Sequence, residues 1–184
     1  MMKIILGENT EMFEITILSQ HWILDNGEYD ANDLCSHGKV YIRVGSEVLN
    51  DGKGDSFTLS TAALLLKRSL QKNCDFEEFD NLMVPCCGHD MYLDPDDPAS
   101  VLVPGCRGGV DWRTTHQGGT VELETRSGSK AVMSFDRGTV LRFVREVEGF
   151  YGSPDNKISD GDEYFRKAFE RFWLEWDALK AKWS

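Results

Sequence analysis

The chain has 184 residues, 41% of them hydrophobic, and a net charge of −11. A chain of this length can bury a sizeable core in one domain, and its apolar content excludes a disordered protein. The longest apolar run, Ala62 to Leu66, is far shorter than the roughly 18 residues of a membrane span, and the first residues lack the apolar segment of a secretory signal. We therefore expect a cytoplasmic protein whose five cysteines are free thiols or metal ligands rather than disulfides.

The negative charge is concentrated in one window of the sequence. Residues 73–106 hold eight acids and no Lys or Arg, whereas residues 107–145 hold seven bases against four acids. Such an acidic field repels nucleic acid and anionic membranes and attracts a basic protein partner or a cation. The predicted binding surface consists of Asp75, Glu77, Glu78, Asp80, Asp90, Asp94, Asp96 and Asp97.

The first third of the chain predicts two strands and a helix. Residues 12–19 and 39–49 are rich in β-branched and aromatic residues, which is typical of strands. A turn-rich break at 50–55 precedes a predicted helix that runs to about Gln71, with Ser56 or Thr58 as its cap. One face of this helix carries only apolar residues, so we expect the helix to be largely buried. These residues are Leu59, Ala63, Leu66 and Leu70.

The middle of the chain predicts short strands and a hairpin. Three apolar runs, 82–84, 91–93 and 101–103, are separated by Pro and Asp and indicate short strands. Gly118 and Gly119 form the two-residue connection of a tight hairpin. Counting outward from that turn pairs His116 with Val121 and Thr114 with Leu123, and residues 130–135 can add a third antiparallel strand.

Two further helices end the chain. The first is predicted over about 136–151 and ends at Gly152. The second begins near Asp160, where Asp160 and Glu163 resemble a capping box. The whole pattern predicts one α+β domain over residues 1–184, with a mainly antiparallel sheet, one buried central helix and two C-terminal helices.

Cysteine and histidine residues cluster around residue 87. Cys86, Cys87 and His89, with Cys106 as the fourth ligand, could bind zinc, which prefers four soft donors at tetrahedral corners. His116 or the pair Cys35 and His37 are alternative ligands. No C-x-x-C pair is present, so the spacing falls outside the strong zinc patterns.

The same cysteines are candidates for a thiol nucleophile, which needs a nearby cation or helix N-terminus and a histidine base. Cys86 and Cys87 lie in the window without bases, where negative neighbours disfavour the thiolate. Cys106 is better placed beside Arg107. A metal-binding or thiol-dependent enzyme that uses Cys86, Cys87, His89 and Cys106 is therefore the alternative function, and the sequence identifies no catalytic residue.

Ser56 lies in a short segment that is similar to a nucleophile motif. Gly54-Asp55-Ser56-Phe57 is similar to the nucleophile block of one esterase family. It follows a polar turn instead of an apolar strand, and no Asp-x-x-His pattern lies near the C-terminus. We therefore interpret Ser56 as a helix-capping residue.

Several blocks together carry a resemblance: Asp33 to Gly38, Leu59 to Leu66, Pro85 to His89, Gly105 to Trp112 and Phe172 to Trp176. They resemble a group of small, uncharacterised bacterial cytosolic proteins, which implies a bacterial single-domain protein and no particular catalytic residue or cofactor. By size, acidity and fold class the chain is also similar to immunity proteins of bacterial toxin systems. We expect a non-enzymatic acidic binding protein, similar to an immunity protein, that docks a basic partner such as a toxin and binds neither nucleic acid nor membrane.

Overall fold

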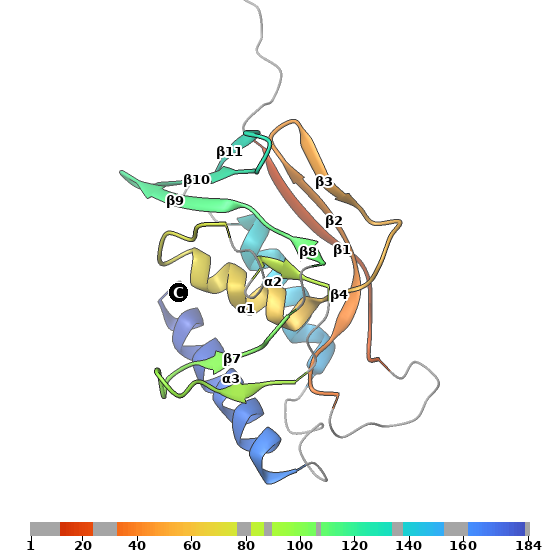
Figure 1. Ribbon diagram of the computed structural model, residues 1–184, viewed down its shortest axis with the longest axis vertical. Helices are drawn as coiled ribbons and strands as arrows, with labels where there is room; N and C mark the ends of the chain where they lie inside the picture. The colour runs from red at the N-terminus through yellow and green to blue at the C-terminus, as the bar shows by residue number, and fades with distance from the viewer. Residues whose placement is uncertain are drawn as a thin grey trace, which may run out of the picture.

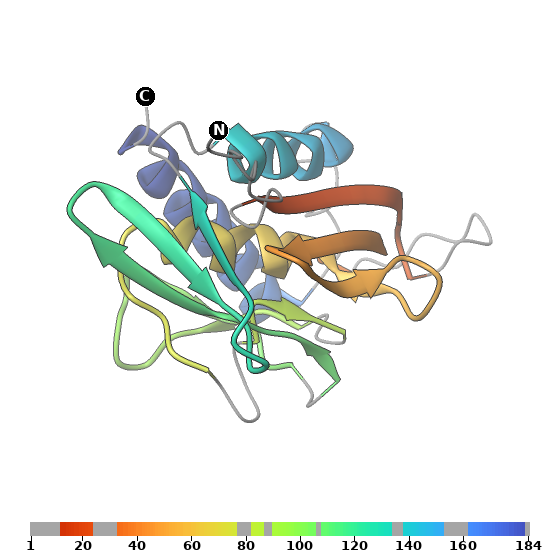
Figure 2. The same cartoon turned by 90° about the horizontal axis from the view of Figure 1, so that it is seen from above.

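The computed structural model describes residues 12–23, 33–76, 82–86, 90–105, 108–133, 138–152 and 162–182. These residues form an α+β fold in which the paired strands are antiparallel, as predicted (Figures 1 and 2). The strands are β1 (Phe13–His21), β2 (His37–Val44), β3 (Glu47–Asp51), β4 (Phe57–Thr58), β5 (Val84–Pro85), β6 (Tyr92–Leu93), β7 (Val101–Leu102), β8 (Gly109–Val110), β9 (Arg113–Gln117), β10 (Thr120–Glu124) and β11 (Lys130–Met133). The helices are α1 (Leu59–Ser69), α2 (Gly138–Tyr151) and α3 (Glu163–Ala181).

The main sheet is built from β1, β2 and β3, with β4 paired to the first residues of β2. The prediction of one continuous strand over 39–49 is wrong, because the chain reverses between β2 and β3. Gly45 has φ 59 at this turn, a backbone conformation that glycine adopts without steric cost. The reversal turns one long apolar segment into two neighbouring strands.

The second sheet is the predicted hairpin with its third strand. His116 pairs with Val121 and Thr114 with Leu123, so the register counted from the glycine turn is confirmed. Gly118 and Gly119 both have positive φ, which explains why glycines occupy the two connecting positions. Strand β11 pairs with β10 and completes the sheet.

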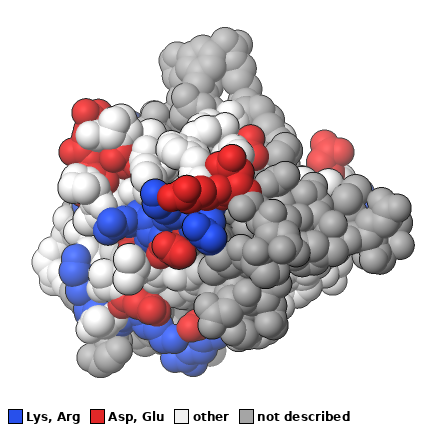
Figure 3. Space-filling view, turned by 90° about the horizontal axis from the view of Figure 1, so that it is seen from below, with Lys and Arg blue, Asp and Glu red and all other residues white. Residues whose placement is uncertain are grey.

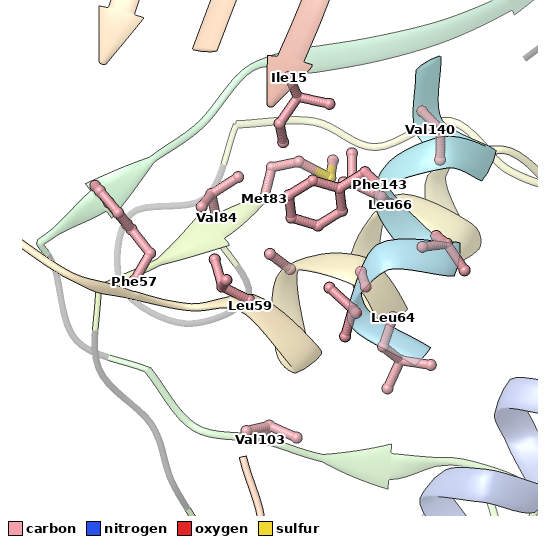
Figure 4. Packing of buried hydrophobic residues seen from close by; sticks show 14 of the residues in the cluster. Ile15, Phe57, Leu59, Leu64, Leu66, Met83, Val84, Val103, Val140 and Phe143 are labelled. Carbon is pink, nitrogen blue, oxygen red and sulfur yellow. The ribbon is translucent and has the colours of Figure 1, made fainter. Parts of the chain in front are cut away.

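Helix α1 lies at the centre of the fold, with α2 and α3 packed beside it (Figures 1 and 2). Nine of its eleven residues are buried, which confirms the predicted central helix. Figure 4 shows side chains of β1, β5, α1 and α2 meeting in this core. At about 25 cal/mol per Å² of apolar surface, such burial is the main stabilising contribution to the fold. No helix of the described residues is both long and apolar enough to cross a membrane.

The two C-terminal helices bury one stripe each. In α2 the stripe runs from Val140 to Tyr151, and Gly152, with φ 65, follows the helix as predicted. The expected cap of α3 at Asp160 is wrong, because Asp162 is the N-cap and its side chain accepts a hydrogen bond from the Tyr164 N–H at 2.8 Å. Asp162 thus satisfies one of the free backbone donors in the first turn of the helix.

A buried ion pair joins three elements of the fold. Arg68 of α1 donates two hydrogen bonds to the carboxylate of Glu175 in α3, at 2.7 and 2.8 Å. The same carboxylate accepts the Val101 N–H at 3.0 Å, and Arg68 also donates to the Val101 carbonyl oxygen at 2.8 Å. One charged pair therefore fixes α1, α3 and β7 relative to one another.

Glu175→Ala leaves the Arg68 guanidinium and the Val101 N–H without their carboxylate partner. We expect the free energy of unfolding to fall by about 3 to 5 kcal/mol, because an uncompensated charge stays in the interior. Urea denaturation followed by circular dichroism measures this loss. The control is Glu163→Ala, which breaks the exposed pair between Glu163 and Lys167 on the same helix. Equal losses in the two variants would show that the buried pair has no special role.

A second cation of α1 is buried among aromatic rings. The Lys67 ammonium donates to the Trp176 carbonyl oxygen at 2.5 Å and lies 4.1 Å from the centroid of the Trp176 ring. Burial lowers the pKa of Lys67 from its ordinary value of 10.5 to about 8. The folded protein thus releases this proton at a lower pH than the unfolded chain does.

Between pH 8 and 10.5 the unfolded state consequently binds more protons at Lys67 than the folded state, so the contribution of this residue to stability rises with pH. We expect the difference in unfolding free energy between the wild type and Lys67→Met to shift in favour of the wild type by up to about 3 kcal/mol across that range. Denaturation of both proteins at several pH values measures the shift. A difference that stays constant with pH would contradict the lowered pKa.

Candidate functional site

The structure describes five of the eight residues of the predicted acidic surface. Asp75 follows α1, Asp90 precedes β6, and the others lie in the turn between β6 and β7: Asp94, Asp96 and Asp97. Glu77, Glu78 and Asp80 lie outside the described residues. The acids thus come from two separate segments of the chain, and the structure brings three of them to one place.

That place is a cleft of about 650 Å³ at the C-terminal end of α1. Its apolar lining comes from Leu65, Met83, Leu102 and Leu179. Its charged lining comprises five acids and two bases: Asp75, Asp94, Asp97, Asp111, Glu175, Arg68 and Lys72. A lining that combines apolar and charged side chains is a surface on which a long basic side chain can bury its stem and pair its charge.

The turn between β6 and β7 holds its carboxylates firmly. Asp94 accepts the backbone N–H groups of Asp96 at 2.9 Å and Asp97 at 3.2 Å, and also the Ser100 hydroxyl at 2.9 Å. These bonds, with the Asp96 N–H first, lower the pKa of Asp94. Within the described residues neither Asp94 nor Asp97 forms a salt bridge. Both are therefore negative charges that a partner can neutralise.

The opposite wall carries acids that already have basic neighbours. Asp75 accepts a hydrogen bond from Arg113 at 2.9 Å, which lowers the pKa of the Asp75 carboxyl. Asp111 lies 3.7 Å from Arg126. The Phe76 ring lies against both guanidinium groups, at 4.8 and 4.7 Å. The charges of these two acids are largely neutralised, so the net charge of the cleft comes mainly from the turn with Asp94.

At least one face of the molecule has a more mixed charge than the sequence window indicates. On the face drawn in Figure 3, Lys and Arg side chains lie interleaved with Asp and Glu side chains over the described residues. Bases that are distant in the sequence, such as Arg68 and Arg113, reach the acids of the window in space. Only part of the predicted field is therefore left uncompensated.

The predicted metal site is only partly described. Cys86 is half-buried beside β5, while Cys87, His89 and Cys106 lie outside the described residues. The alternative ligand His116 has its Nε2 atom 2.8 Å from the Ser69 carbonyl oxygen, as expected of a hydrogen-bonded histidine at the rim of the core. Among the described side chains, no group of three or more His, Cys, Asp or Glu could hold a metal ion.

Cys35 lies in a buried polar cluster rather than at a reactive surface. Burial raises the pKa of its thiol to about 12, and the Asp33 carboxylate adds to the rise. The neighbouring Ser36 N–H donates to the hydroxyls of Ser60 at 3.1 Å and Tyr151 at 3.2 Å. A thiol in these surroundings stays protonated at neutral pH and is a poor nucleophile.

Sequence reasoning missed one contact of chemical interest. The interpretation of Ser56 as a helix cap is wrong, because α1 has Thr58 at its N-cap position and no side-chain capping bond. The Ser56 hydroxyl oxygen instead lies 3.3 Å from Nε2 of His21, the last residue of β1. No local pattern could reveal this pair, because 35 residues separate its members.

Comparison with protein-family models, with curated proteins and with solved structures finds no match to this chain. The functional argument therefore rests on the geometry and the charge of the residues above.

Cys35 should be inert to thiol reagents in the folded protein. We expect iodoacetamide at neutral pH to leave Cys35 unmodified until the chain is unfolded, because the thiol is buried and its pKa is about 12. Mass spectrometry of proteolytic peptides measures the modification before and after denaturation. Modification of Cys35 at the same rate in both states would contradict this description.

Proposed function

We propose that the protein is a binding protein whose acidic cleft docks a basic protein partner. The observation that carries the proposal is the convergence of Asp75, Asp94 and Asp97, from two separate segments, on one cleft that also has apolar lining residues. A Lys or Arg side chain of a partner can lay its methylene groups on Leu65 and Leu102. Its charged end then pairs with the carboxylates of the turn between β6 and β7.

The arrangement of the charges supports this proposal further. Arg68, the largest cation at the cleft, is neutralised by Glu175, so it does not repel a basic ligand. The bound backbone donors keep Asp94 ionised at neutral pH and hold it in one position. A carboxylate that is already oriented loses little side-chain entropy when it meets a cation.

A bacterial toxin with a basic surface is one partner whose charge is complementary to this cleft. The protein would then act as the immunity protein of that toxin. Steering by the acidic residues would make association fast at low ionic strength and strongly dependent on salt.

The test replaces the two uncompensated carboxylates by their amides, in Asp94→Asn with Asp97→Asn. The asparagine oxygen at 94 can still accept the backbone N–H groups, so the turn keeps its shape. We expect the variant to bind a fluorescently labelled octalysine peptide about tenfold or more weakly at low salt, as measured by fluorescence anisotropy. High salt should abolish the difference between the variant and the wild type.

The matched control is Glu146→Gln with Glu170→Gln, which removes the same charge from exposed positions on α2 and α3. It should bind the peptide almost as the wild type does. Equal weakening in both double variants would show that net charge alone attracts the peptide. Absence of binding by the wild type at low salt would contradict the docking proposal itself.

A further inference from the structure

Ser56 and His21 form a polar pair at the end of the main sheet, away from the residues that line the acidic cleft. His21 is the last residue of β1, and Ser56 immediately precedes β4. The Ser56 Oγ atom lies 3.3 Å from Nε2 of His21. A hydroxyl and an imidazole nitrogen at this distance are within the range of a nucleophile and its base before substrate binds.

The surroundings of the imidazole determine which nitrogen carries the proton. Nδ1 of His21 lies 2.8 Å from the Trp22 carbonyl oxygen, which can only accept a hydrogen bond. In the neutral ring Nδ1 therefore carries the hydrogen, and Nε2 presents its lone pair to Ser56. This is the tautomer in which a histidine can take the proton of a serine hydroxyl.

The Trp22 carbonyl is itself held in place from both sides. The next residue, Ile23, donates its N–H to the Asp33 carboxylate at 2.7 Å. The Trp22 ring packs against Phe150 and Tyr151 of α2, with centroid distances of 4.8 and 5.2 Å. The carbonyl that orients His21 thus belongs to an anchored segment. Ser56, His21 and the Trp22 carbonyl therefore stand in the order of nucleophile, base and orienting acceptor.

The pair is also within reach of a ligand. Ser56 and His21 are both half-buried, so neither is sealed in the core. Gly54, two residues before Ser56, is exposed, and a Cβ atom at this glycine would have no described atom within 4 Å.

We propose that Ser56 is an activated nucleophile that hydrolyses carboxylic esters, with His21 as its general base. The Ser56 oxygen attacks the ester carbonyl carbon while its proton passes to Nε2 of His21, and the leaving alcohol takes that proton as the carbon–oxygen bond breaks. Water then attacks the acyl-serine while one of its protons passes to His21. As the bond between the acyl carbon and the serine oxygen breaks, His21 gives this proton to the serine oxygen, and the acid is released. The inference rests on the contact between the Ser56 hydroxyl and the His21 ring. In the chain, the proposed base His21 precedes the proposed nucleophile Ser56.

Esters are the substrate class that this arrangement favours over amides. The group that orients His21 is an uncharged carbonyl, which stabilises the imidazolium less than the carboxylate of a serine protease triad does. A pair without this carboxylate suits a substrate whose leaving group departs easily. Alcohols leave more readily than amines, so the pair should act on esters with good leaving groups.

The experiment treats the full-length protein with a fluorophosphonate probe and measures hydrolysis of p-nitrophenyl butyrate. The serine oxygen displaces fluoride from phosphorus, so an activated serine becomes covalently labelled. Peptide mass mapping should place the label on Ser56, and Ser56→Ala should abolish both the labelling and the ester hydrolysis. Ser46→Ala removes another exposed serine and should change neither signal.

His21→Gln distinguishes a base from a structural tie, because glutamine can still hydrogen-bond to Ser56 but cannot accept its proton. We expect labelling and hydrolysis to fall by about 100-fold or more in this variant, with an unchanged circular dichroism spectrum. Labelling that maps elsewhere, or that persists unchanged in His21→Gln, would overturn the proposal. Asp94→Asn with Asp97→Asn should retain full labelling, which separates this activity from the proposed docking function.

Discussion

The bidentate pair between Arg68 and Glu175 is the interaction on which the arrangement of the functional surface depends. It joins the end of α1 to α3, and through both backbone groups of Val101 it also positions β7. Burial makes these charges costly unless every donor and acceptor is satisfied, and here the carboxylate accepts three hydrogen bonds. The turn that carries Asp94 and Asp97 leads directly into β7, so its place in space follows from this pair.

Helix α1 links the two candidate sites. The polar turn that carries Ser56 leads into β4 and then into the first residue of α1, while the acidic cleft surrounds its last turn. The helix is almost entirely buried and cannot shift without opening the core. Both sites are therefore built on loops and strand ends that a rigid central element holds, which is the usual placement of functional residues.

Much of the fold could be predicted because its determinants are local. The glycine pair at 118 and 119 sets the register of the hairpin, and the apolar stripe from Val140 to Tyr151 marks the buried face of α2. Prediction failed where a local pattern had two solutions. The segment 39–49 reads as one strand, and only the pairing of β3 on β2 shows that it folds back at Gly45.

In the candidate sites, too, some features follow from the sequence and others only from the fold. The sequence by itself determined that acids concentrate between residues 73 and 106, since charge is a property of composition. Only the tertiary structure decided which of them remain uncompensated, because Arg68 and Arg113 approach from other elements. It also decided that Ser56 meets His21 rather than capping α1. Local patterns encode backbone geometry and burial, whereas ion pairs and hydrogen bonds between distant residues exist only after the chain has folded.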